Sequence, residues 1–422
     1  MLKKNKKEIK KICIISDCFV PKKSSAAGML YNLSKGLIDR NKVVICIFGS
    51  SKSEKWKIDN NKLKDYDLKK IQTITSDFLE KFRYGSYYSR FIFEILLSCS
   101  LSFKIIKHRN ILLDTDLVIC YSPSAFLWLP SLLLKRLTKA PLYLILRDIF
   151  PDWLINLEII KNKTVIYFLN LITKPQLMIP DVIGCESIND KLALKKKLKN
   201  KNIQTLYNWP SLSHNIFKKS KKSPFIKSYK SAQKKHSNYI KSVYTGNDGV
   251  AQDFKRGIDF IINYLSSDGN NHDLILNKFS PFENAEENFV SNKDSFIVKN
   301  WGMISGNLLD DIYNLSDFGI VSLNTKHRTN NLPGKFISYI QHGLPVLCFA
   351  NKNNELSQII LKNNCGCVVD LNDKQDYNFK ILRLFLNKIR DKKNVYHRNS
   401  LNLFNRYFSL DNAINNIIDH KY

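Results

Sequence analysis

Short apolar runs, each separated from the next by enough chain for a helix, constrain the fold of this sequence more than any other feature. In the first half they fall at residues 12–16, 43–48, 117–120, 142–146 and 182–185, with a helix predicted at 29–37. Continuous apolar runs of this length are typical of strands in a parallel sheet that helices cover on both faces. Right-handed crossovers between such strands predict a doubly wound α/β domain that ends near residue 207.

A second series of strands and helices follows a polar stretch. Residues 208–240, rich in Lys, Ser, Pro and Asn, break the alternation and are predicted to connect two domains. Strands are then expected at residues 242–245, 274–276, 295–298, 318–322, 345–349 and 366–369, and helices at 258–265, 308–315, 336–342, 356–361, 377–390 and 410–420. The sequence therefore predicts tandem α/β domains over residues 1–207 and 241–395.

The charge of the chain favours an anionic partner. The formal net charge is +29, from 66 Lys and Arg against 37 Asp and Glu. Such a balance suits nucleic acid, an anionic membrane surface or a phosphorylated substrate. The sequence has no recognised nucleic-acid-binding motif and no basic stripe with interleaved aromatic residues, so nucleic acid is not expected as a partner.

Composition also bears on localisation and on metal binding. No run reaches the roughly 18 consecutive apolar residues of a membrane-spanning helix, and no small-residue cleavage site follows the basic start, so membrane insertion and secretion are not expected. The nine cysteines lie mostly in apolar runs and are expected to be core residues in a reducing cytoplasm. Cys365 and Cys367 lack a second pair or a nearby His at zinc spacing, so no metal site is predicted.

The loop after the first predicted strand is the first candidate ligand site. It begins at Asp17 and leads through Ser24 to Gly28 at the start of a helix. The carboxyl end of a strand in a doubly wound sheet faces the ligand crevice, and a helix N-terminus offers free N–H groups to an anion. The segment lacks the Gly-x-Gly-x-x-Gly pattern, so a dinucleotide is not implied, and an ordinary strand-to-helix turn is the alternative.

A glycine-bearing segment after the first strand of the second domain is the second candidate. It contains Gly246, Asn247, Gly249 and Gln252. Two glycines with an amide between them suit a turn whose N–H groups face a phosphate, and Arg256 just beyond can add positive charge. A plain turn between a strand and a helix explains the same residues equally well.

The third candidate is the junction before the strand at residues 345–349. Pro333 and Gly334 punctuate a loop, and the residues after them can form two helical turns. Lys335 and Ser338 are spaced i and i+3, so both can face the diphosphate or the ribose of a nucleotide. A helix-to-strand junction without a ligand is the alternative.

The order of these segments, with Asp148 in Arg147-Asp-Ile-Phe-Pro151 between the first and the second, resembles the two-domain glycosyltransferases of the GT-B fold. The similarity is to glycosyltransferase family 4 and, within it, to the bacterial subgroup that assembles O-antigen, capsule and similar surface polysaccharides. It is carried by Gly246-Asn-x-Gly-x-Ala-Gln252 and by Pro333-Gly-Lys-Phe-x-Ser-Tyr-x-Gln-x-Gly-Leu-Pro-Val346. Residues 396–422 are similar to the family's terminal segment, which returns to the first domain.

The resemblance implies two doubly wound Rossmann-like domains with a cleft between them, the first on the acceptor side and the second binding the donor. It implies transfer of a sugar from a UDP- or GDP-linked donor to a lipid-linked or saccharide acceptor, with retention of configuration and with no metal or other cofactor. Asp148 is then the catalytic candidate, and Asp17 and Gly28 belong to the acceptor-side loop. The candidates for donor binding are Gly246, Asn247, Gly249, Gln252, Arg256, Asn330, Pro333, Gly334, Lys335 and Ser338.

The sequence departs from the family pattern at charged positions. The family carries two glutamates eight positions apart before its Gly-x-Pro-Val, and here those positions hold Asn330 and Ser338. Its usual Arg after the strand glycine is Asn247, and its usual Lys falls near Gln252, so Lys335 becomes the best candidate for neutralising the diphosphate. Two alternatives stay open. The missing glutamates support a catalytically silent subunit that partners another glycosyltransferase. They argue against a nucleotide-sugar epimerase of the same fold, which would need an additional acid and base near the sugar.

Two further motifs bear on this interpretation. Asp114-Thr-Asp116 matches the Asp-x-Asp pattern with which a different glycosyltransferase fold holds a metal-bound nucleotide, but it precedes a strand, so a cap or turn is predicted. Residues 82–107 form an aromatic and aliphatic segment bounded by cations. This segment suits either a helix lying on an anionic membrane or a buried helix of the first domain. With a lipid-linked acceptor, the expected place is the cytoplasmic face of the inner membrane, as a peripheral protein.

Overall fold

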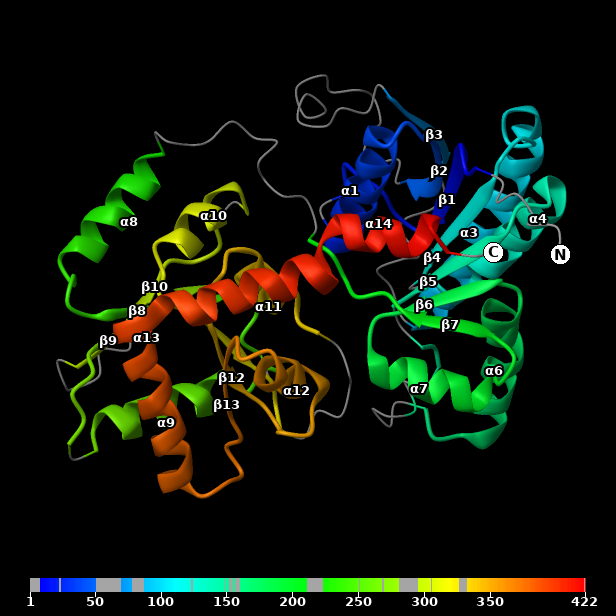
Figure 1. Cartoon of the computed structure of the whole chain (residues 1–422). Helices are drawn as coiled ribbons and strands as arrows, with labels where there is room; N and C mark the ends of the chain where they lie inside the picture. The colour runs from blue at the N-terminus through cyan, green and yellow to red at the C-terminus, as the bar shows by residue number, and fades with distance from the viewer. Residues whose placement is uncertain are drawn as a thin grey trace, which may run out of the picture. The chain divides into compact units, whose positions relative to one another are not determined.

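The structure is a computed structural model (Figure 1). Its chain divides into two compact units: unit 1 comprises Met1–Leu212 with Leu410–Tyr422, and unit 2 comprises Ser213–Ser409. The residues that the structure describes are 8–22, 24–50, 70–77, 87–122, 124–147, 149–151, 155, 160–210, 223–249, 251–267, 269–280, 295–304, 306–325, 332–420 and 422.

Unit 1 is built on a seven-stranded parallel sheet in the order β3-β2-β1-β4-β5-β6-β7. Its strands are β1 (Lys11–Ser16), β2 (Val43–Ser50), β3 (Ile71–Asp77), β4 (Leu117–Ser122), β5 (Leu142–Leu146), β6 (Val182–Cys185) and β7 (Asn202–Thr205). Its helices are α1 (Ser25–Asp39), α3 (Tyr87–Lys107), the 3-10 turns η3 (Arg109–Ile111) and η4 (Ala125–Leu127), α4 (Trp128–Thr138), α6 (Lys163–Met178), α7 (Ile188–Lys197) and α14 (Leu410–Ile418).

Helices cover both faces of this sheet, because its strands are apolar on both sides. On one face, α3 and α4 share a buried cluster with alternate residues of β1, β2 and β4. On the other, α1 packs against α14, whose Ile414 and Ile417 are buried. The Ile414 side chain lies so close to Gly36 that a Cβ there would come within 2.5 Å of it. Arg40, which directly follows α1, also donates to Asp411 at 2.7 Å. The segment α14 is therefore an integral layer of unit 1.

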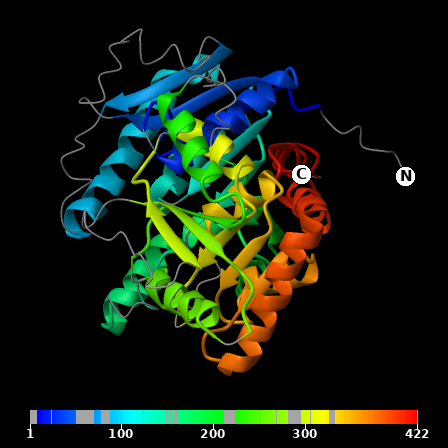
Figure 2. The same cartoon turned by 90° about the vertical axis from the view of Figure 1, so that its left-hand side faces the viewer.

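Unit 2 carries a six-stranded sheet in the order β10-β9-β8-β11-β12-β13, parallel throughout (Figure 2). Its strands are β8 (Ile240–Thr245), β9 (Leu274–Phe279), β10 (Phe296–Asn300), β11 (Phe318–Ser322), β12 (Val346–Phe349) and β13 (Gly366–Val369). Its helices are α8 (Pro224–Lys234), α9 (Phe254–Leu265), α10 (Gly306–Asn314), α11 (Gly334–Gln341), α12 (Glu355–Lys362), α13 (Gln375–Leu403) and a π-helical turn (Phe404–Phe408). Two doubly wound α/β units confirm the predicted fold class.

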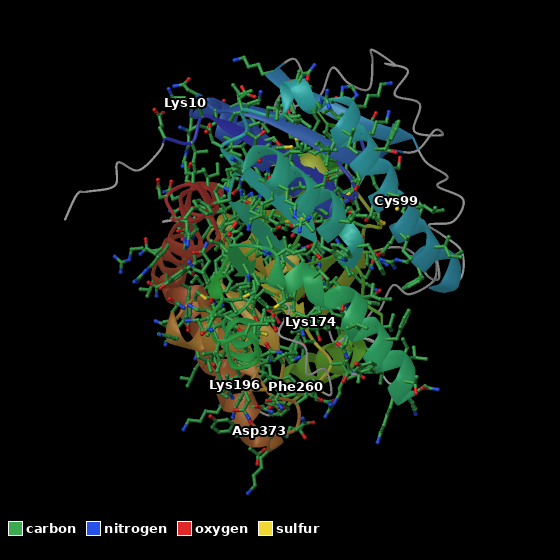
Figure 3. The ribbon with its side chains drawn as sticks, turned by 90° about the vertical axis from the view of Figure 1, so that its right-hand side faces the viewer. Lys10, Cys99, Lys174, Lys196, Phe260 and Asp373 are labelled. Atoms are coloured by element: carbon green, nitrogen blue, oxygen red, sulfur yellow. The ribbon has the colours of Figure 1, made fainter. Side chains whose placement is uncertain are left out.

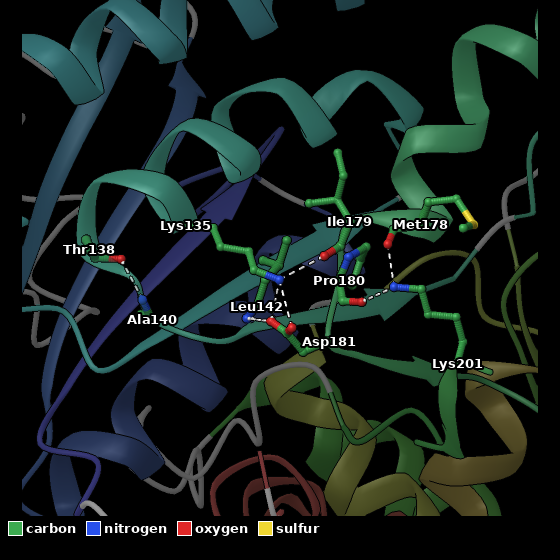
Figure 4. A network of polar contacts seen from close by, with 9 residues as sticks. All are labelled: Lys135, Thr138, Ala140, Leu142, Met178, Ile179, Pro180, Asp181 and Lys201. Carbon is green, nitrogen blue, oxygen red and sulfur yellow. Dashed lines mark hydrogen bonds and ion pairs between the residues drawn. The ribbon is translucent and has the colours of Figure 1, made fainter.

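The amino ends of the strands are held together by aspartates that precede a strand and bind its neighbour. Asp116 accepts hydrogen bonds from the backbone N–H groups of Lys10 and Lys11, both at 3.0 Å. Asp181 accepts from Leu142 N at 2.7 Å and pairs with Lys135 (Figure 4). In unit 2, Asp317 accepts from Lys241 N at 2.8 Å.

This repeated contact gives the Asp114-Thr-Asp116 motif a structural role, as predicted. Asp114 pairs with the Lys11 side chain, which lowers the pKa of its carboxyl. The amino edge of each sheet is therefore used for cohesion, and the carboxyl edge is the one left for ligands.

Several elements lie where the sequence named none: the helices α4, α6, α7 and α8 and the edge strands β3 and β7. β3 and β7 mix polar and apolar residues, because an edge strand is less completely buried than a central one. The helix α8 falls inside residues 208–240, which were predicted to be a connection. Its sequence is rich in Lys and Ser, but Ile226, Tyr229 and Gln233 are buried and lie at the spacing of one helix face.

Most of the cysteines are core residues, as predicted. All nine are free thiols and eight are buried. The exception is Cys99, which Figure 3 labels on α3.

Candidate functional site

The candidate donor site lies where β8 and β11 end in unit 2. These strands are neighbours, and the chain continues from β8 to β9 on one side of the sheet and from β11 to β12 on the other. In an open α/β sheet, such a reversal leaves a crevice outside the carboxyl ends of the two strands, and ligands bind there. The second and third sequence candidates follow β8 and β11 respectively, so the fold brings them to one place.

The loop after β8 is shaped by a glycine that no other residue replaces easily. Gly246 has a φ of 92°, in the left-handed region, and its N–H donates to the Phe279 carbonyl at 2.9 Å. Gln252 N then closes a turn on Gly249 O at 2.9 Å. The helix α9 begins two residues later, so Gly246, Asn247, Gly249 and Gln252 all belong to one strand-to-helix turn.

Three contacts fix this glycine loop against the strands. The Tyr244 hydroxyl donates to the Asn247 carbonyl. Ser322, the last residue of β11, donates to the Gln252 carbonyl at 2.6 Å. Asn324 N donates to the Ala251 carbonyl at 3.0 Å. The loop is therefore preorganised by its own unit.

Lys335 is the cation that the structure places against this loop. Its ammonium nitrogen lies 3.6 Å from the centre of the Tyr244 ring and 3.4 Å from the Asn247 carbonyl oxygen. The same nitrogen is 4.0 Å from where a Cβ on Gly246 would stand. Burial lowers the pKa of Lys335 to about 7, and the nearby Asp248 carboxylate opposes this shift only in part.

The amino end of α11 adds backbone donors beside Lys335. Pro333 is the residue before the helix and makes no side-chain cap, and Gly334 opens the helix with open space around it. The N–H groups of an uncapped first turn carry partial positive charge and suit an anion. Ser338 was predicted to face the same ligand, and its hydroxyl donates to the Gly334 carbonyl at 3.2 Å.

Tyr339 sets the position of α11 relative to β8. Its ring packs on β11 at Gly319, where an added Cβ would come within 2.3 Å of it. Its hydroxyl accepts from Thr245 N at 3.1 Å and donates to the Val243 carbonyl at 3.3 Å. Lys335, one turn earlier on the same helix, is thereby held in register with the glycine loop.

A second lysine, which sequence reasoning missed, also reaches the loop. Lys278, near the end of β9, pairs with Asp248, and both side chains are largely buried. Only the pairing of β8 with β9 brings this residue close, and no local motif signals it. Lys278 therefore adds a cation beside the loop, and Asp248 balances its charge.

Arg256 lies in the first turn of α9, shortly after the glycine loop, and approaches the Asp253 carboxylate at 4.0 Å. Its guanidinium also donates to the Leu371 carbonyl at 2.9 Å and to the Asn372 side chain at 3.3 Å, just after β13. Asn330 and Asp148 fall outside the described residues. Across the described ranges, no group of three or more His, Cys, Asp or Glu side chains has an arrangement that could hold a metal ion.

The first sequence candidate lies at the carboxyl edge of the sheet in unit 1. Asp17 directly follows β1 and is buried, and Gly28 is buried in the first turns of α1. Ser24 caps this helix by accepting from Ala27 N at 3.2 Å. Burial raises the pKa of Tyr121, at the end of β4, to about 12. The charge of Arg147 opposes this shift, and the charges of Glu186 and Asp17 add to it.

Known structures share this fold over nearly the whole chain. A glycosyltransferase from Rickettsia africae matches with a TM-score of 0.62 and 12% identity, covering 98% of each chain. An E. coli trehalose-6-phosphate structure bound with UDP-2-fluoro glucose gives a TM-score of 0.65 at 12% identity, over 97% of this chain and 98% of that one. Anabaena HepE in complex with UDP and glucose gives 0.56 at 14%, over 97% and 98%. No protein-family model and no curated protein matches the sequence. The chain therefore has the GT-B fold.

Proposed function

We propose that this protein is a glycosyltransferase that moves a sugar from a nucleotide diphosphate donor to a lipid-linked or saccharide acceptor. The observation that carries the proposal is the meeting of Lys335, the glycine loop and the uncapped start of α11 at the switch point of unit 2. Two solved structures with this fold contain UDP or a UDP-sugar, which supports a UDP-linked donor, with GDP as the other candidate nucleotide.

The proposed step breaks the bond between the anomeric carbon and the diphosphate oxygen, and the electron pair leaves with the diphosphate. An acceptor hydroxyl forms the new C–O bond, and its proton passes to the departing phosphate oxygen. Lys335 and the N–H groups of the glycine loop stabilise the negative charge that develops on the leaving group. These groups can supply the charge that a metal ion supplies elsewhere, so the proposed reaction uses no metal. Retention of configuration is proposed from the resemblance to a subgroup of retaining enzymes.

The biological setting that we propose is bacterial surface polysaccharide synthesis, as in O-antigen or capsule assembly. This assignment, and membership of glycosyltransferase family 4, rest on the resemblance of the segments 246–252 and 333–346. The alternative of a catalytically silent subunit draws on Ser338, whose hydroxyl donates to its own helix at a position where the family has a carboxylate.

Turnover separates these alternatives. The purified full chain is screened by thermal shift against UDP- and GDP-sugars, because a ligand that binds only the folded state raises the melting temperature. We expect one donor to stabilise the chain and to be consumed with release of its nucleotide diphosphate. A chain that binds the donor without consuming it, with any saccharide or lipid-linked acceptor, would support the silent subunit; failure to bind any nucleotide diphosphate would contradict both.

A lipid-linked acceptor would bring the protein to the cytoplasmic face of the membrane, and α3 is the element that we propose to lie on it. Its inward face, Phe93, Leu97, Leu101 and Ile105, belongs to the core of unit 1. Its outward face exposes Ile92 by 49%, Phe103 by 67% and Ile106 by 53%. Among the described helices, none is both long enough and apolar enough to cross a membrane.

We expect the full chain to sediment with vesicles that contain phosphatidylglycerol and to dissociate as salt is raised. The outward aromatic and aliphatic residues would enter the interface, and Arg90, Lys104 and Lys107 would each add about 1 kcal/mol near anionic lipid. Changing Phe103 and Ile106 to Ser should reduce the bound fraction severalfold.

Leu361→Ser is the matched control, because Leu361 is 53% exposed on α12 of unit 2. Equal loss of binding in this control, or no binding of the wild type at low salt, would remove α3 from the membrane and leave the transferase proposal untouched.

A further inference from the structure

A second polar centre lies in unit 1, at the carboxyl edge of its sheet. Arg147 directly follows β5 and is only 8% exposed. Its Nη1 donates to the Leu206 carbonyl at 2.8 Å. The guanidinium carbon lies 5.3 Å from the Trp209 ring centre and 6.0 Å from that of Tyr121. One hydrogen bond and two aromatic rings therefore hold this buried cation in a fixed position.

Two other nitrogens of Arg147 make no hydrogen bond within the described part of the chain. Its Nε and Nη2 are buried, and neither has a hydrogen-bond partner among the described residues. In a guanidinium, Nε–H and Nη2–H point along one shared edge, which matches two oxygens of a carboxylate or a phosphoryl group. Buried donors and a buried charge are costly to leave unsatisfied, so the open edge indicates a ligand with two acceptor oxygens.

The charges around this edge limit what the ligand can be. Asp17 follows β1 and Glu186 follows β6, and both act electrostatically on Tyr121 together with Arg147. Glu186 also accepts from the Asn208 amide at 2.5 Å. Both carboxylates repel negative charge on a ligand, and the repulsion is greater for a doubly charged phosphate monoester than for a singly charged group. A carboxylate or a phosphodiester presents two oxygens with a single charge and is therefore favoured.

We propose that Arg147 binds a singly charged oxyanion, a carboxylate or a phosphodiester, carried by the molecule that receives the sugar. The identity of that molecule as an acceptor rests on the proposed function, whereas the anion site rests on the contacts of Arg147 alone. The site lies where ligands bind in open parallel sheets, at the carboxyl ends of β4, β5 and β6.

The test uses glucuronate and dimethyl phosphate as probes, with neutral glucose for comparison, titrated into the full chain at constant ionic strength. We expect at least one anion to bind saturably and glucose not to bind. Arg147→Lys keeps the charge but loses the two-donor edge, so we expect at least tenfold weaker anion binding and unchanged UDP affinity. Arg109→Gln removes an exposed arginine of η3 in the same unit and should bind like the wild type.

Each outcome decides the question. Binding of glucuronate alone indicates a uronate-like acceptor, and binding of dimethyl phosphate alone indicates a phosphodiester. Failure of both anions to bind the wild type, or equal binding to wild type and Arg147→Lys, would overturn the proposal and leave Arg147 as a structural residue. Anion binding without sugar turnover would retain the site and contradict the transferase function instead.

Discussion

Replacing Lys335 with Ala is expected to weaken the binding of UDP or GDP by about 10- to 150-fold, which corresponds to ~1.5–3 kcal/mol for a charge-assisted hydrogen bond. The ammonium group lies 3.4 Å from the Asn247 carbonyl, at the edge of the glycine loop where a diphosphate would sit. Isothermal titration at pH 6.5 measures the effect while the lysine is mostly protonated.

A matched variant checks that the effect is local. Lys362→Ala removes the same charge from the exposed last turn of α12 and should leave the affinity within about twofold of the wild type, because charges separated by more than a Debye length are screened. Unchanged nucleotide affinity in a folded Lys335→Ala protein would remove this residue from the donor site.

Donor affinity is expected to fall as the pH rises above neutrality. The pKa of Lys335 in the free protein is about 7, because the side chain is largely buried against Tyr244. Only the protonated ammonium attracts a diphosphate. Above pH 7 most of the free protein carries a neutral lysine, so Lys335 must take up a proton when the diphosphate binds, and the affinity falls as the pH rises. If the bound lysine stays protonated, the affinity should drop about 25-fold between pH 7.5 and 9.

The terminal phosphate of a nucleotide diphosphate ionises near pH 6, so its own titration does not explain a change above pH 7.5. Lys335→Met removes the titrating group and keeps the apolar stem, so its weaker affinity should be nearly constant over this interval. Proton uptake measured by titration in two buffers of different ionisation enthalpy gives an independent readout. A wild-type affinity that is flat from pH 7.5 to 9 would contradict the assignment.

The central strands could be predicted from the sequence because burial on both faces leaves no room for polar residues. The strands predicted at residues 142–146, 182–185 and 318–322 have the same bounds as β5, β6 and β11. The edge strands β3 and β7 were not predicted because polar residues interrupt their apolar runs. The helix α8 was not predicted because its few buried residues are spread through a Lys- and Ser-rich segment whose composition is typical of a connection.

For the donor site, short sequence motifs predicted the loops, but they could not predict which residues from other strands contact those loops. Glycines at Gly246 and Gly249 and the Pro333-Gly334 junction were visible as turn signals. Lys278 reaches the same loop only through the pairing of β9 with β8, a relation that no short motif encodes. Arg256 follows the loop closely in sequence, its guanidinium contacts the segment after β13, and its part in donor binding stays a prediction.

The order in which unit 1 receives its parts has a consequence for synthesis on the ribosome. The segment α14 covers α1 through Ile414, Ile417 and the contact of Arg40 with Asp411, but it is translated only after all of unit 2. At 5–20 residues per second, the roughly 200 intervening residues take about 10 to 40 s. During that time the α1 surface that α14 later covers is open to water or to a chaperone. Unit 2 can reach its native fold first, and unit 1 is completed last although most of it is made earlier.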